Sequence, residues 1–173
     1  MGDAAVALRL RSGFSSVDQG QHFGLSAATH SGEWSWLVHA QLRDTEGTAT
    51  AGTVETRDRR RTAVDPTERQ HRALLAKAVW DAAAGQRLRL TLDAGESESM
   101  IDIASDLGPQ VVFGRPLQVL ESRADDQKDR LRLSIDGEHA LTGLPWLHSL
   151  RWRMHRQESE TVQQTFQRRD LGQ

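Results

Sequence analysis

Two carboxylates at the ends of apolar segments are the first candidates for chemistry in this sequence. Asp102 lies within Met100–Ile103, and Glu121 comes near the end of the apolar stretch Leu117–Ser122. If they lie close together, they could hold a Mg²⁺ ion that steadies an attacking or leaving oxygen. Arg123 stands where a proton carrier would be useful, but its guanidinium stays charged at neutral pH. The pair gives one weak motif for a metal-dependent enzyme.

Histidine is the other residue type that could bind a metal or move a proton. None of the seven histidines forms a pair with the spacing of metal ligands on a helix. They are His22, His30, His39, His71, His139, His148 and His155. A site assembled from distant strands would need inward polar groups, for which His39, His148 and Asp102 are the candidates.

Other catalytic motifs are missing from the sequence. There is no cysteine, which excludes disulfides, thiolate nucleophiles and cysteine-ligated zinc. No phosphate-binding glycine loop follows an apolar segment, and no G-x-S-x-G nucleophile motif occurs. The sequence therefore predicts no catalytic residue, no bound metal and no cofactor, and it favours a non-catalytic protein over an enzyme.

Arginines recur at alternate positions of three segments that are typical of strands. Leu88–Asp93 is repeated as Leu131–Asp136, and Leu150–Met154 alternates in the same way. Such alternation indicates strands that bury one face and expose the other, so we expect the leucines to be interior and the arginines wet. We predict that the wet face binds a partner through Arg87, Arg89, Arg130, Arg132, Arg151 and Arg153. A merely solvated sheet face would explain the same residues.

The net charge of the chain disfavours some classes of binding partner. A formal net charge of -2 supplies no general attraction to nucleic acid or anionic lipid. A nucleic-acid binder would need the arginines to cluster without carboxylates such as Asp93 and Asp136. We therefore expect a protein partner or self-association and disfavour nucleic acid. No apolar run approaches the roughly 20 residues that span a bilayer, so we expect no membrane.

The N-terminal residues can be compared with the pattern of a signal peptide, which indicates the cellular location of a protein. Met1–Ala5 lack the basic start and apolar core of a signal peptide. If the chain is complete, the cytoplasm is the expected location.

Tryptophans offer a second set of candidate contacts. Trp34 and Trp36 alternate with polar residues and share one face of a predicted strand, where we expect them in the core. An exposed pair would instead indicate a ligand or partner cleft. Trp146 follows Pro145 in a predicted loop and is the best candidate for an exposed anchor.

One helix is predicted, over about residues 66–84. Asp65 offers an N-cap, Pro66 suits the first helical position, and Glu68 completes a capping box. An apolar stripe with helical spacing follows at Leu74, Leu75, Ala78, Val79 and Ala82. Gly85 is positioned to end the helix.

Together these features predict a single α+β domain over residues 1–156. We expect a mainly antiparallel, strongly bent sheet, or a small barrel or sandwich, beside the one principal helix. Residues 157–173 are predicted to be a polar, loosely packed C-terminal tail. The favoured function is a non-catalytic binding or assembly component that acts through the charged sheet face. The alternatives are a metal-dependent or small-ligand enzyme with its site inside the bent sheet, and a nucleic-acid-binding domain that uses the strand arginines.

Overall fold

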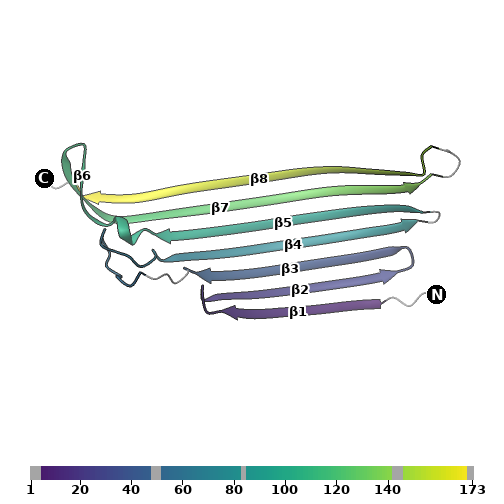
Figure 1. The fold of residues 1–173 in the computed structure, drawn as a ribbon, viewed down its shortest axis with the longest axis horizontal. Helices are drawn as coiled ribbons and strands as arrows, with labels where there is room; N and C mark the ends of the chain where they lie inside the picture. The colour runs from purple at the N-terminus through teal and green to yellow at the C-terminus, as the bar shows by residue number, and fades with distance from the viewer. Residues whose placement is uncertain (1–4, 48–51, 83–84, 142–145, 171–173) are drawn as a thin grey trace.

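The computed structural model describes residues 5–47, 52–82, 85–141 and 146–170, which form one antiparallel sheet (Figure 1). Its strands are β1 (Ala5–Ser15), β2 (Gly20–Ser31), β3 (Trp34–Glu46), β4 (Thr67–Ala82), β5 (Gln86–Asp102), β6 (Gly108–Val112), β7 (Arg115–Ala140) and β8 (Ser149–Asp170). A single 3₁₀ turn, η1 (Ala104–Asp106), is the helical element of the described part.

The strands follow one another across the sheet with few departures from chain order. The order is β1-β2-β3-β4-β5-β7. Strand β8 pairs with the edge of β7 that faces away from β5. Strand β6 pairs with residues 115–119 of β7, beyond the segment that pairs with β5. Figure 1 shows the strands side by side in one open layer. The prediction of a mainly antiparallel sheet is confirmed. The prediction of an α+β domain with a bent sheet, barrel or sandwich is wrong.

The predicted helix over residues 66–84 is also wrong, because residues 67–82 form strand β4. Leu74 and Ala78 are four residues apart. This spacing places two side chains on the same face of a helix, but it also places them on the same face of a strand. Pairing with β3 on one side and β5 on the other satisfies the backbone of β4 from both edges, and this outweighs its helix propensity. Gly85 has a φ of 73° and precedes β5 instead of capping a helix. Residues 83 and 84 lie outside the described part.

The two repeated segments are strands, as predicted, and they pair with each other. Leu90 lies opposite Ile135, and Leu92 lies opposite Leu133. The antiparallel register also sets Arg89 opposite Asp136 and Asp93 opposite Arg132. Opposite charges directly across a strand pair are favourable. The repeat is therefore a pair of complementary neighbours.

Several segments rich in polar, charged or glycine residues are continuous strand. Residues 95–99 lie in β5, residues 123–129 and the pair 136–137 lie in β7, and residues 157–170 extend β8 instead of forming a loose tail. The side chains of residues 157–166 are exposed on both sides of the sheet, so this stretch lacks a clear apolar alternation. Backbone pairing between long neighbouring strands keeps these segments extended.

The enclosed core is small and lies at the end of the sheet near η1. It consists of Leu107, Leu117 and Val119, with Val112 packed against it. Asp106 connects η1 to β7 and β8, because its carboxylate accepts hydrogen bonds from Ser122 Oγ at 3.3 Å and from Gln167 Nε2 at 2.6 Å. The predicted interior for the repeated leucines is absent from the described residues: Leu90, Leu131 and Leu133 are 46%, 48% and 49% exposed.

Candidate assembly interface

The register of the sheet separates apolar and charged side chains onto two faces. Residues directly opposite each other on neighbouring strands project to the same side. We call one side the apolar face and define it by Val6, Leu8, Leu10, Leu25, Trp34, Trp36, Val38, Leu74, Trp80, Leu88, Leu90, Leu92, Leu131, Leu133, Ile135, Trp152 and Met154. The alternating residues between them form the charged face.

The apolar face consists of four rows of side chains that run across the strands. One row joins Trp36, Ala78, Leu90, Ile135 and Met154 through direct strand pairing. With strands about 4.8 Å apart and rows about 7 Å apart, these rows cover roughly 600 to 900 Å². Patches on ordinary monomers are smaller, at about 300 to 600 Å².

Three tryptophans form a ridge at one end of this face. Trp34 stacks on Trp36 with ring centroids 5.5 Å apart, and on Trp80 with centroids 5.9 Å apart. Trp80 Nε1 donates a hydrogen bond to Glu33 Oε2 at 3.0 Å, which fixes the edge of the ridge. Trp34 and Trp36 are 43% and 50% exposed, so they are an exposed pair instead of the predicted core.

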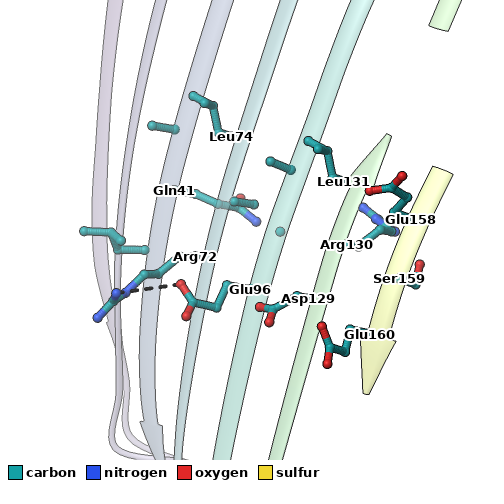
Figure 2. A pocket seen from close by; sticks show the side chains of 15 residues that line it. Gln41, Arg72, Leu74, Glu96, Asp129, Arg130, Leu131, Glu158, Ser159 and Glu160 are labelled. Atoms are coloured by element: carbon teal, nitrogen blue, oxygen red, sulfur yellow. Dashed lines mark ion pairs between the residues drawn. The ribbon is translucent and has the colours of Figure 1, made fainter. Parts of the chain in front are cut away.

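A hollow of about 760 Å³ lies on the same face, separated from the ridge by the row of Val38, Ala76, Leu92 and Leu133 (Figure 2). Its floor is made of small side chains and backbone at Ala40, Ala94 and Gly95, with Leu74 and Leu131 at its apolar end. The hollow forms because Ala40 and Ala94 are smaller than the adjacent residues on the same face of their strands, which are Val38 and Leu42 on β3, and Leu92 and Glu96 on β5. Figure 2 shows Leu74 and Leu131 at one end of the hollow, with Glu158 beside Leu131, and shows Glu96, Asp129 and Glu160 at the other end.

Carboxylates end the apolar face beyond the hollow. Arg72 lies among them, with Nη1 3.8 Å from Glu96 Oε2. We call this region the acidic band and define it by Asp44, Glu96, Glu98, Asp125, Asp129 and Glu160. The face is therefore apolar at the tryptophan end and negative at the other end.

The six arginines that the sequence singles out all lie on the charged face, on the adjacent strands β5, β7 and β8. Four of them form ion pairs there: Arg87 with Asp81, Arg130 with Asp93, Arg151 with Glu138, and Arg153 with Asp136. The hydrogen bond to Asp81 raises the pKa of Arg87 above its ordinary value.

Arg89 and Arg132 differ from the other four. Within the described residues, neither has a carboxylate oxygen within 4.0 Å. Arg89 borders a hollow of about 470 Å³ together with Arg87, Arg151 and Arg153. This part of the charged face could receive a carboxylate from another protein.

The remaining candidates do not gather into a site. His39 accepts or donates a 2.8 Å hydrogen bond with Ser26 Oγ, and Asp102 is paired with Arg57 Nη2 at 2.8 Å. His148 is exposed beside the start of β8, and Trp146 is 75% exposed in a turn. No group of three or more metal-binding side chains occurs among the described residues.

Sequence patterns missed the apolar face as a surface. Its residues were visible as alternating leucines and tryptophans, but alternation alone implies a covering layer. Within the described residues no second layer covers them. The sequence signal for this is the scarcity of further apolar segments, since residues 52–66 and 103–114 are short and form no second sheet.

The sequence matches no protein-family model, and no curated protein is similar to it. In the described ranges, no helix has the length and apolar character needed to cross a membrane.

Proposed function

We propose that this protein is a non-catalytic assembly component whose apolar face packs against an apolar surface of another folded protein chain. The observation that supports it is the apolar face, whose four rows cross the sheet and are not covered by the described part of the chain. On the edge strand β8, two rows continue at Trp152 and Met154, and the other two end at the ion pair of Arg156 and Glu158. The estimated area of the apolar face matches the roughly 800 Å² that each partner contributes to a standard interface.

The chemistry of the face favours a protein surface that is itself apolar. Aromatic and aliphatic side chains dominate the buried centre of interfaces, and charged residues are depleted there. The face carries both aromatic and aliphatic groups at its centre, while Arg72 and the acidic band lie at its margin. Burying this centre removes apolar area from water, which drives association.

This proposal moves the contact from the charged face, where the sequence placed it, to the opposite face. The charged face stays a second candidate, for an acidic protein surface, because Arg89 and Arg132 are not engaged by carboxylates in the described structure. Nucleic acid fits poorly, since the other four arginines are interleaved with carboxylates.

The test compares the native complex of the full chain with two matched variants of strand β3. Trp36→Glu places a charge in the centre of the apolar face, and Gln41→Glu places the same group on the charged face. We expect the wild type and Gln41→Glu to migrate from native extracts as a complex larger than 19.3 kDa, and Trp36→Glu to migrate as a monomer. Unchanged migration of Trp36→Glu, with a strand-type circular dichroism spectrum, would contradict the proposal.

The second candidate has its own test. Reversing both Arg89 and Arg132 to glutamate repels an acidic partner surface and leaves the apolar face intact. Loss of the complex in this double variant, together with its survival in Trp36→Glu, would assign the contact to the charged face.

A further inference from the structure

We propose that the chain packed against the apolar face is a second copy of this protein, related by a two-fold axis that runs across the strands between the two sheets. This inference depends on the proposed function, because it names the partner of the same face. Stacked sheets pack about 10 Å apart, so two such faces would form the sandwich interior that one copy lacks. A two-fold axis also makes one surface serve both partners.

The charge layout of the face selects the direction of the axis. A two-fold axis parallel to the strands places each row of side chains opposite the same row of the second copy. Glu96, Asp129 and Glu160 would then face the carboxylates of the second acidic band. Such contacts are repulsive and desolvate the charges. An axis across the strands reverses the rows, so each acidic band extends past the apolar rows of the other copy and stays in water.

The shape of the face supports the same axis. The four apolar rows begin at Trp34 and end at Ala40 along β3. Reversing the rows sets Trp34 of one copy over Ala40 of the other, and Leu88 over Ala94. Trp34 of each copy then enters the hollow of the other copy at Ala40, and Trp80 packs on Leu74 at its apolar end. On the edge strand β8, the same reversal sets Trp152 over Glu158. Cores and interfaces pack to high density by this kind of interdigitation.

The centre of the proposed dimer lies on β4, the middle strand between β1 and β8. Around the axis, Ala76 of one copy faces Ala78 of the other. Two small residues at this crossing allow the sheets to approach closely. Gln70, farther along the same strand and on the same face, then lies beyond the second copy.

The first experiment measures the purified chain alone by sedimentation. We expect a species of about twice 19.3 kDa for the wild type and for Gln41→Glu. Trp36→Glu should weaken dimerisation by about 100-fold or more, because it buries an unpaired charge. A monomeric wild type whose native complex still requires Trp36 would overturn the second copy but leave the proposed function standing. A wild type that floats with phosphatidylcholine vesicles instead of dimerising would overturn both.

The second experiment tests the axis by cysteine cross-linking, for which the absence of native cysteine gives a clean background. Mixing Ala76→Cys with Ala78→Cys should give a covalent dimer with a short bis-maleimide linker, because facing Cα atoms about 10 Å apart are too far from each other for a direct disulfide. Gln70→Cys alone should give no covalent dimer with the same linker. Cross-linking of Gln70→Cys without the mixed product would show an axis parallel to the strands and contradict the proposed arrangement. Failure of both, in a chain that dimerises by sedimentation, would place the contact elsewhere.

Discussion

The indole rings of Trp34 and Trp80 lie stacked, with centroids 5.9 Å apart and planes inclined by 17°, because the pairing of β3 with β4 sets the two residues directly opposite each other. This contact joins the last residues of β4 to the first of β3. It also fixes the ridge that we propose as the prominent part of the assembly surface.

Removing Trp80 should therefore destabilise the sheet as well as the ridge. Trp80→Ala deletes the stack on Trp34 and the hydrogen bond to Glu33, for an expected loss of about 2 kcal/mol in the free energy of unfolding. Urea unfolding followed by circular dichroism measures it. Trp146→Ala is the matched control, since this indole is 75% exposed in a turn, and it should change stability by less than about 0.5 kcal/mol.

Gly137 has a packing role that its neighbour Trp152 defines. A Cβ at this position would lie 2.2 Å from the indole ring of Trp152, which donates a hydrogen bond from Nε1 to His139 Nε2 at 3.0 Å. Gly137→Ala should displace the ring, change its fluorescence and destabilise the protein by roughly 1 to 3 kcal/mol. The double variant with Trp152→Ala should lose less than the sum of the single changes.

Gly95 provides the opposite case on the neighbouring strand. A Cβ there meets nothing closer than the carbonyl oxygen of Arg72 at 3.8 Å. Because glycine weakens a strand interior, Gly95→Ala should be neutral or stabilising by up to about 1 kcal/mol. A large destabilisation of Gly95→Ala in the same urea assay would contradict the packing described for this part of β5.

Arg61 organises the segment before β4, although the run Arg57–Arg61 suggests an exposed connection. Its side chain is only 9% exposed, and it donates hydrogen bonds to the carbonyl oxygens of Glu55 at 3.1 Å and Val64 at 2.6 Å. Arg61→Gln should cost roughly 2 to 3 kcal/mol, because hydrogen bonds to a charged donor are lost from a shielded site.

The control for this prediction is Arg59→Gln, two positions away. Arg59 is exposed, so its substitution should leave the unfolding midpoint in urea nearly unchanged. Equal effects of the two substitutions would show that Arg61 does not hold the segment.

Asp58 should remain ionised to unusually low pH. Hydrogen bonds from the side chain and backbone N–H of Arg60 lower the pKa of Asp58 from 3.8 to about 2. The unfolded chain therefore binds more protons than the folded chain between these values, so the contribution of Asp58 is complete above about pH 4 and is lost as the pH falls toward 2.

Carboxyl NMR titration of Asp58 measures this pKa directly. Arg60→Gln should return it toward 3.8, since the guanidinium provides the largest part of the shift. A titration of the wild type near 3.8 would show that the contact with Arg60 is not maintained in solution.

The local alternation of the sequence was informative where one face is apolar. Leu88–Asp93, Leu131–Asp136 and Trp34–Leu42 were recognised as strands because their side chains alternate between two environments. The same rule fails in residues 157–170, where both faces are exposed and pairing with β7 keeps the backbone extended. It fails in β4 because alanine-rich sequence fits helical and extended spacing equally well.

The partner-binding role of the six arginines stays a prediction, although their positions on the strands follow from the sequence. Placing the six arginines on alternate strand positions correctly set them on one side of each strand, and their common face followed once β5, β7 and β8 proved to be neighbours. The apolar face escaped prediction because the same leucines and tryptophans are also typical of an ordinary core.

The sequence by itself determined which side chains share a side of each strand, because that alternation is a property of the extended backbone within a few residues. Only the tertiary structure decided which strands are neighbours, that Trp34 meets Trp80, and that no second layer of the described chain covers the leucines. These features depend on pairing between residues far apart in the chain, where long-range hydrogen bonding overrides local propensity.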